Sequence, residues 1–338
     1  MFKFIDLFAW IWWIRQAFTN LWGKCVFSLD RDKYCSISYK ENYWEELNWD
    51  ITQVKTSDIP DFDILTGWFP CQPFSIAWVS SKNFLWLEHW FKDIDQWNLF
   101  FEIARIVKDK QPKALFLENV KNLQSHDKWN TFNVIYETLT KLWYNVYYKV
   151  INAKYYVPQN RERIVIIWLR RDIFNNIWFF FPNYPSKRLY ELNDIIENKV
   201  DDKYTLSDKL WNYLKERKEK MKMKWNGFWY WLIDPKKDDI TRTISARYYK
   251  DGSEVLIKQN NKNPRKLTPR ECARLMWFPE DFKIVVSDIQ AYKQFGNSVV
   301  IPAMQSVADI LVKYIESVNN WKLDNSILLK YLNEHFWK

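Results

Sequence analysis

Short apolar runs alternate with amphipathic stretches through the first half of the chain. Runs rich in isoleucine, leucine, valine and phenylalanine predict buried strands, and stretches with an apolar residue every three or four positions predict helices. The expected strands cover 2–8, 25–29, 63–66, 114–117, 145–151 and 163–169, and the expected helices cover 13–19, 32–42, 99–108 and 130–142. This alternation is typical of an α/β fold whose parallel sheet carries helices on both faces and binds ligands at the carboxyl ends of its strands.

The alternation stops near residue 181, where a different kind of sequence begins. Two prolines, a charged helix predicted over 206–223 and irregular polar and aromatic sequence indicate a second, smaller domain. Thr268 is expected to cap a helix with Pro269 in its first turn, and a long amphipathic helix is predicted over 299–317. We predict a first domain over 1–183, completed by 297–338, and a second domain over 184–296.

Charge and cysteine usage narrow the class of protein. A chain of 338 residues with a net charge of +9 can bury a large core and suits a polyanionic partner, although many basic proteins have none. The four cysteines lack paired spacing and the three histidines are far apart, so we expect no disulfide framework and no metal site. No apolar run reaches the length of a membrane helix, and Asp6 interrupts the one stretch that resembles a signal peptide. We expect a cytoplasmic protein that does not enter a membrane.

Tryptophan is far too common and glycine far too rare. The chain has 22 tryptophans and 5 glycines, whereas ordinary proteins contain about 7% glycine. Several tryptophans stand where a chain needs a flexible residue, namely Trp10, Trp12, Trp13, Trp49, Trp68 and Trp143. One hypothesis is that UGA codons that specify glycine have been read as tryptophan. The alternative is an aromatic protein, such as a sugar binder that presents tryptophans on a sheet face.

Four residues that can carry chemistry follow the predicted strands. Cys71, in "TGWFPCQPFS", comes soon after the third strand, and the prolines on either side stiffen its backbone. A lone cysteine there would more often be a small buried residue than a nucleophile. Glu118 ends the next strand in "LENV", and Arg161 and Arg163 in "PQNRERIVII" are alternate residues that enter a strand on one face.

With tryptophan read as glycine, these motifs resemble those of the cytosine carbon-5 DNA methyltransferases. "FIDLFAWIWW" is similar to the family's FxGxG cofactor loop, and the cysteine, glutamate and arginine motifs follow in the family's order. "RKLTPRECARLMWFP" and "QFGNSV" are similar to its last two motifs, so the resemblance spans residues 4 to about 302. It implies a Rossmann-like fold for S-adenosylmethionine-dependent methyl transfer, with a mostly parallel sheet and a smaller target-recognition domain.

The resemblance also implies roles for the four residues. Cys71 would add to carbon 6 of cytosine, which turns carbon 5 into a nucleophile for the methyl group. Glu118 would hydrogen-bond nitrogen 3 and the exocyclic amine, and Arg163 would hold the carbonyl and, with Arg161, favour the thiolate. Because these ring atoms are hidden in a duplex, the cytosine would have to swing out of the helix.

Cofactor residues are implied at several strand ends. The methionine part of S-adenosylmethionine would lie against the loop Phe8, Ala9, Trp10, Ile11, Trp12 and Trp13. Asp30 would bind the ribose hydroxyls, and Asp50 and Ile51 would hold the adenine. The pocket would be completed by Pro70, Leu99, Asn297 and Ser298. Arg31 stands where some members have an aromatic that stacks on adenine, and real tryptophans in the loop would fill the methionine channel.

Double-stranded DNA is the implied partner. The expected DNA contacts are Gln72, Ser75, Arg242, Arg247 and Tyr249, and the variable region over 184–262 resembles enzymes that methylate CCWGG and related sites. We expect a monomer that works alone or beside a cognate restriction endonuclease without binding it. Two other functions stay open, a transfer RNA cytosine methyltransferase and a DNA-binding protein that has lost catalysis.

Overall fold

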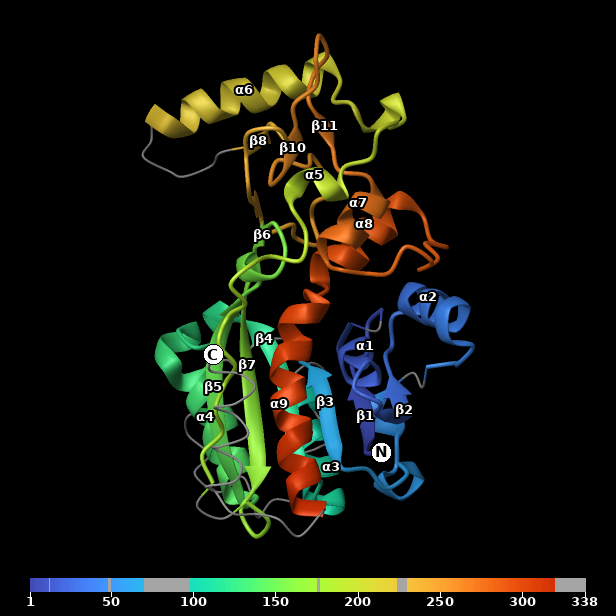
Figure 1. The fold of residues 1–338 in the computed structure, drawn as a ribbon, viewed down its shortest axis with the longest axis vertical. Coiled ribbons are helices and arrows are strands. Elements are labelled where there is room, and N and C mark those ends of the chain that lie inside the picture. The colour runs from blue at the N-terminus through green and yellow to red at the C-terminus, as the bar shows by residue number, and fades with distance from the viewer. Residues whose placement is uncertain (12, 48–49, 70–97, 175–176, 224–229, 320–338) are drawn as a thin grey trace.

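The computed structural model describes residues 1–11, 13–47, 50–69, 98–174, 177–223 and 230–319. Figure 1 shows a large sheet with its helices in one lobe and a group of short strands and helices in a second lobe. The apolar segments expected to form strands and helices in the first half of the chain do form them, with ends that differ by a few residues.

Six strands form the large sheet, in the order β2-β1-β3-β4-β7-β5. Their bounds are β1 Lys3–Leu7, β2 Lys24–Leu29, β3 Ile64–Trp68, β4 Ala114–Val120, β5 Tyr144–Asn152 and β7 Glu162–Arg170. Strands β2, β1, β3 and β4 are parallel to one another, but β7 runs antiparallel to both β4 and β5. Parallel pairing was therefore the wrong expectation for β7. Its link from β5 is too short for the crossover that a parallel strand requires.

Helices cover both faces of this sheet. They are α1 Trp13–Thr19, α2 Lys33–Tyr43, α3 Asn98–Lys110, α4 Asn130–Lys141 and α9 Ile301–Asn319. Phe4 of β1 and Phe116 of β4 share one buried cluster with α1 and α9, whereas Ile5 and Leu115 share another with α3 and α4. Because successive strand residues point to opposite faces, each strand serves both clusters. Figure 1 shows α9 crossing the face of the sheet.

The C-terminal helices are apolar enough to be compared with membrane spans. The continuous stretch Asp288–Val318 passes a test of length and mean hydropathy, and 72% of its most apolar window is buried inside the protein. Tyr314, Leu311 and Val307 are among its fully buried side chains. The stretch therefore packs as the core helices of a folded domain do.

The second lobe contains short elements around a smaller core. Its helices are α5 Leu192–Ile195, α6 Asp208–Met223, α7 Pro269–Leu275 and α8 Asp288–Asn297. One small sheet has the order β11-β10-β8, and its strands are Arg265–Lys266, Leu256–Ile257 and Leu232–Ile233. The other pairs β6 Gln159–Asn160 with β9 Thr241–Arg242 and so joins the segment before β7 to this lobe. The domain limits at 183 and 297 stay a prediction.

Short 3-10 turns connect many of these elements. They cover Ile51–Gln53, Thr56–Asp58, Lys121–Leu123, His126–Trp129, Ala153–Tyr155 and Asp202–Tyr204. The predicted cap of α7 is present, because Thr268 accepts a hydrogen bond from the Glu271 amide at 3.1 Å and Glu271 accepts one from the Thr268 amide at 2.8 Å. This reciprocal pair satisfies two amides at the start of the helix.

Candidate active site

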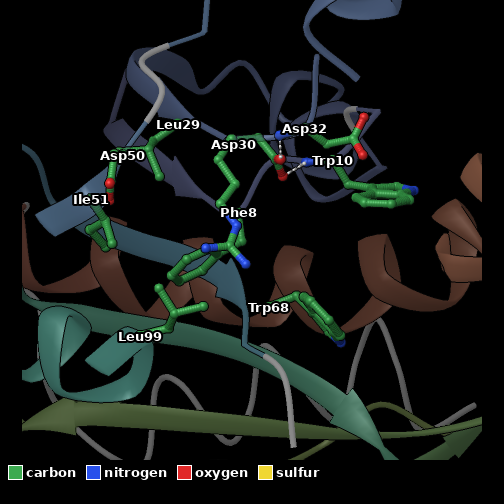
Figure 2. A pocket seen from close by; sticks show the side chains of 10 residues that line it. Phe8, Trp10, Leu29, Asp30, Asp32, Asp50, Ile51, Trp68 and Leu99 are labelled. Atoms are coloured by element: carbon green, nitrogen blue, oxygen red, sulfur yellow. Dashed lines mark hydrogen bonds between the residues drawn. The ribbon is translucent and has the colours of Figure 1, made fainter. Parts of the chain in front are cut away.

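A cavity lies at the carboxyl ends of β1, β2 and β3, where the sheet pattern predicts a ligand. Its volume is ≈ 420 Å³. The side chains around it come from the ends of these strands, from the start of the 3-10 turn Ile51–Gln53 and from the start of α3 (Figure 2): Phe8, Trp10, Leu29, Asp30, Arg31, Asp32, Asp50, Ile51, Trp68 and Leu99. Six of the expected cofactor residues are in this set.

Asp30 is held at the cavity by two backbone amides. Its carboxylate accepts hydrogen bonds from the Trp10 amide at 2.9 Å and from the Asp32 amide at 2.8 Å. Burial raises the pKa of Asp30 to about 6, although these two amides oppose the shift. Asp30 is thus ionised at neutral pH, and a carboxylate held by two amides presents its remaining lone pairs in a fixed direction.

The loop after β1 is strained where it meets the cavity. Phe8 has a φ of 57° and Trp10 a φ of 53°. Residues other than glycine rarely adopt such positive values. Figure 2 shows the Trp10 indole turned away from Phe8 and Leu99. The indole nitrogen donates to the Gln294 carbonyl at 2.8 Å, at the end of α8. In this arrangement the Trp10 ring borders the cavity without crossing it.

The adenine residues expected from the sequence lie together. Asp50 caps a 3-10 turn and accepts hydrogen bonds from the Thr52 amide at 3.0 Å and the Thr52 hydroxyl at 2.9 Å. Ile51 is 1% exposed, and Leu99 lies near it across the cavity in Figure 2. This end of the cavity offers an apolar surface beside an acid, which suits a flat ring with an amine.

Four of the expected cofactor residues do not line the cavity. Ala9 and Ile11 are buried in the core beneath the loop. Asn297 is exposed, and the buried Ser298 hydroxyl donates to the Gln294 carbonyl at 2.8 Å. Their cofactor roles stay predictions. Trp12 and Pro70 lie outside the described residues, and only the backbone of Trp13 is described, at the start of α1.

Glu118 and Arg163 meet at the same edge of the sheet. Glu118 is 1% exposed, and the Arg163 Nε lies 3.1 Å from its Oε1. The pair forms because β7 is antiparallel, so that its first residues lie beside the last residues of β4. Within the described residues Glu118 Oε1 has no partner with hydrogen-bond geometry, so the contact is a charge pair. Burial raises the pKa of Glu118 to about 7, and Arg163 and Arg161 limit the rise.

The Arg161 side chain is hydrogen-bonded to backbone carbonyls. It is 1% exposed, and its guanidinium donates to the carbonyls of Ile244 at 2.9 Å, Gly296 at 2.8 Å and Ser298. These carbonyls belong to the second lobe and to the end of α8. The geometry gives Arg161 the task of holding segments together, which the sequence pattern did not indicate.

Asn119 is a site residue that the sequence reasoning missed. It is 0% exposed, and its side-chain amide donates to the Phe69 carbonyl at 2.7 Å. Phe69 is two residues before Cys71, so Asn119 fixes the chain that leads into the cysteine motif. The signal was present in "LENV", where a buried asparagine needs hydrogen-bond partners. Cys71, Gln72 and Ser75 themselves lie outside the described residues.

The expected recognition residues lie on the second lobe. Arg242 is exposed on β9, and its guanidinium lies 4.7 Å from the centre of the Trp231 ring. Arg247 is exposed and Tyr249 half-buried in the segment that follows. The Arg161 bond to Ile244 ties this segment to the start of β7. The segment that carries these three expected residues is thus connected to the start of β7 by a hydrogen bond from a side chain to a carbonyl.

Comparison with known proteins assigns the fold and the family. The C-5 cytosine-specific DNA methylase family matches residues 2–313. The chain is 48% identical over 317 residues to the Type II methyltransferase M1.ScrFI of Lactococcus lactis subsp. cremoris, which covers 93% of this chain and 79% of that one. It is 45% identical to the Type II methyltransferase M.NlaX of Neisseria lactamica, over 96% of this chain and 100% of the relative.

A solved structure supports the same fold. The crystal structure of the S. pombe Dnmt2 methyltransferase superposes with a TM-score of 0.73 over 93% of this chain and 99% of that one, at 16% sequence identity. The methyltransferase fold expected from the motifs is therefore confirmed, as is the family that they resemble. The chain belongs to the C-5 cytosine-specific DNA methylases and is a DNA methyltransferase.

Proposed function

We propose that this enzyme transfers a methyl group from S-adenosylmethionine to carbon 5 of a cytosine swung out of duplex DNA, through a covalent bond between Cys71 and carbon 6. The observation that carries the proposal is the buried pair of Glu118 and Arg163 at the sheet edge. Asn119 at the end of β4 donates a hydrogen bond to the carbonyl of Phe69, which is two residues before Cys71 in the chain. An acid, a cation and a thiol are the groups that addition to a pyrimidine ring requires.

Glu118 supplies the acid. With a pKa of about 7 caused by burial, it is neutral in much of the population near neutral pH. A neutral carboxyl donates to ring nitrogen 3 and accepts from the exocyclic amine, whereas an ionised one can only accept. The hydrogen bond to nitrogen 3 stabilises the charge that develops there as the Cys71 sulfur bonds to carbon 6. Once carbon 5 has accepted the methyl group, a base removes the carbon-5 proton, and the electrons left behind break the carbon–sulfur bond and release Cys71 as a thiolate.

Arg163 holds the cytosine carbonyl in this scheme. Its side chain is 15% exposed and already faces Glu118, so a base that enters the edge meets both groups at once. Arg161 has a different role. Because its guanidinium is committed to three carbonyls, it positions Arg163 and the recognition segment and does not touch the base. Ring atoms of a stacked base pair are out of reach of this edge, so the cytosine must leave the duplex.

The cavity fits S-adenosylmethionine. Asp30 provides fixed acceptors for the ribose hydroxyls, Asp50 an acceptor for the adenine amine, and Ile51 and Leu99 an apolar surface for the ring. Phe8 lies at the turn where the methionine part would pass. When bound, the cofactor supplies a methyl group on a positively charged sulfur. The chain's own contribution is to orient that group toward the edge that carries Glu118.

Recognition of a CC-type site, CCWGG or a relative, is assigned to the second lobe. Arg242, Arg247 and Tyr249 are the candidate readers, since arginine pairs with guanine through two hydrogen bonds. Gln72 and Ser75 would contact the DNA near the flipped base. The net charge of +9 supports binding to phosphates. The enzyme is proposed to act as a cytoplasmic monomer, as the modification partner of a restriction endonuclease or alone.

Label transfer tests this function. Two forms of the protein are purified, one with tryptophan and one with glycine at positions 10, 12 and 13. Each form receives labelled S-adenosylmethionine with duplex DNA or with transfer RNA. Label on DNA that disappears with Cys71→Ser supports the proposal. Label only on RNA would replace it with a transfer RNA methyltransferase, and cofactor binding without transfer to either would leave a DNA-binding protein without catalysis.

A further inference from the structure

Six tryptophans have a left-handed backbone. Their φ values lie between 53° and 75°: Trp10, Trp22, Trp44, Trp129, Trp143 and Trp277. Only Phe8, Gln111 and Asn261 share this feature among the other described residues larger than glycine. At positive φ a side chain collides with the backbone, and glycine avoids this collision because it has no Cβ.

The helix ends show why these positions want glycine. After α7 the Trp277 amide donates to the Arg274 carbonyl at 2.9 Å, and the Phe278 amide donates to the Ala273 carbonyl at 3.0 Å. These two bonds form the Schellman motif, whose left-handed residue is usually glycine. Trp277 occupies that position.

The same arrangement recurs at other helices. After α1 the Trp22 amide donates to the Thr19 carbonyl at 3.0 Å, and the next amide, that of Gly23, donates to the Phe18 carbonyl at 3.1 Å. Trp44 ends α2 with a single bond to the Lys40 carbonyl at 2.8 Å. Trp143 follows α4 and donates to the Thr140 carbonyl at 3.1 Å. Four helices thus end on a tryptophan in the glycine conformation.

The indole rings at three of these six positions gain little from packing. Trp22 is 84% exposed, Trp44 82% and Trp143 67%, so their rings lie mainly in solvent. Trp277 does stack on Tyr190, with ring centres 4.2 Å apart, and the Trp10 indole makes its bond to Gln294. Packing therefore does not explain why the largest side chain stands at every one of these turns.

Trp211 provides the contrast. It is the fourth residue of α6, and its ring contacts Tyr230 with centres 4.8 Å apart. Here the indole is packed, and a glycine within the helix would be unfavourable. The backbone thus distinguishes the six tryptophans at left-handed turns from Trp211, which stands at a position that suits tryptophan.

We infer that the working enzyme carries glycine at positions 10, 22, 44, 129, 143 and 277 and tryptophan at 211, because its gene uses UGA for glycine and UGG for tryptophan. Position 10 gives this inference a functional side. A glycine there relieves the strained turn beside Asp30 and removes an indole from the rim of the cofactor cavity. The inference does not depend on the proposed reaction, since it concerns backbone conformation.

Codons and peptides test it directly. In cells that carry the gene, the six positions are expected to have UGA codons, and peptides of the purified protein are expected to contain glycine there. Trp211 is expected to have UGG and to remain tryptophan. UGG codons at the six positions, or tryptophan in those peptides, would overturn the inference.

Thermal unfolding gives an independent test on recombinant protein. Three chains are compared: the chain with tryptophan at all seven positions, the chain with glycine at the six turn positions, and the chain with Trp211→Gly alone. The sixfold change is expected to raise the unfolding midpoint by at least about 5–10 °C, or to yield folded protein where the chain with seven tryptophans gives none. Trp211→Gly is expected to lower the midpoint. An unchanged or lower midpoint after the sixfold change would contradict the inference, whatever the enzymatic activity.

Discussion

Glu118 combines burial with a neighbouring cation, and its protonation decides what it can do for a base. Its pKa of about 7 reflects loss of solvent, which the Arg163 charge offsets only in part. Below that pH the carboxyl is neutral and can donate a hydrogen bond, and above it the carboxyl is ionised and cannot. We therefore expect the proposed contribution of Glu118 to methyl transfer to be lost as the pH rises through 7.

Glu118→Gln tests this dependence. Glutamine donates a hydrogen bond at every pH but has no acidic proton, so we expect a rate loss of about 10²–10³. We also expect the decline on the alkaline side of pH 7 to disappear. Single-turnover methyl transfer over a pH series measures both effects. The matched control is Glu162→Gln, which removes the charge of a half-buried neighbour paired with Lys121 at 2.9 Å. An unaltered pH profile in Glu118→Gln would show that this carboxyl is not the titrating group.

Asp6 is a second buried acid, and its effect is on stability. Burial raises its pKa from 3.8 to about 7, although Thr66 donates to it at 3.0 Å. The folded state thus keeps a proton that the unfolded state releases, so stability is full below pH 3.8 and falls as the pH rises toward 7. Asp6→Asn is expected to reduce the stability loss across this window by on the order of 1–4 kcal/mol.

Urea unfolding at several pH values measures the effect of Asp6→Asn against the original chain. Asp61→Asn serves as the control for loss of an acid at the surface, because its side chain is 97% exposed and pairs with Lys110 at 3.4 Å. If Asp6→Asn and the original chain lose stability in parallel between acidic and neutral pH, Asp6 is not a buried titrating acid.

At the scale of the elements, Arg161 connects three segments. It joins the start of β7 to Ile244 in the second lobe and to Gly296 and Ser298 at the end of α8. Gly296 packs closely against the second lobe, since an added Cβ would lie 2.2 Å from the Ser245 carbonyl oxygen. The segment proposed for recognition, the start of β7 and the end of α8 thus meet at one junction.

Arg161→Lys is expected to loosen that junction. Lysine keeps the charge but lacks the planar fork that serves three carbonyls. Because small misplacements of reacting groups slow catalysis, we expect kcat to fall about 10–100-fold. The affinity for S-adenosylmethionine should be unchanged, since Arg161 does not line the cavity. Steady-state kinetics and calorimetry measure the two values, with Arg171→Lys as the control. Equal loss of kcat and cofactor affinity would indicate general unfolding.

How far the sequence predicts these elements depends on where the information lies. The spacing of apolar residues within β1 and within α4 is a local feature of the sequence, so the positions of these two elements can be predicted from it. The reversal of β7 is not local, because it depends on the link from β5 and on pairing with β4. Glu118 and Arg163 were identified from motifs, but their meeting depends on that reversal. The resemblance assigned Arg161, with Arg163, to the thiolate. Its bonds to three carbonyls could not be predicted, because these carbonyls lie far away in sequence.

Charge acts at the scale of the whole molecule. A net charge of +9 and exposed arginines on the second lobe predict binding to DNA that weakens with salt. If six to ten phosphates are contacted, affinity falls by about 10³–10⁵ between 50 and 200 mM salt. Fluorescence anisotropy with a labelled duplex measures this decline, and cofactor affinity provides the control, because it should change little. DNA binding that is indifferent to salt would contradict phosphate contacts.

The central claim is a covalent bond between the Cys71 sulfur and carbon 6 of cytosine, and a trapping experiment tests it most directly. A duplex with 5-fluorocytosine in a CC-type site retains the bond, because the fluorine cannot leave as the carbon-5 proton does. The protein with glycine at the six turn positions and at positions 12 and 13 is expected to give a denaturant-resistant adduct only when S-adenosylmethionine is present. Cys71→Ser should abolish it. A folded protein that binds cofactor and methylates DNA but forms no adduct would contradict the account.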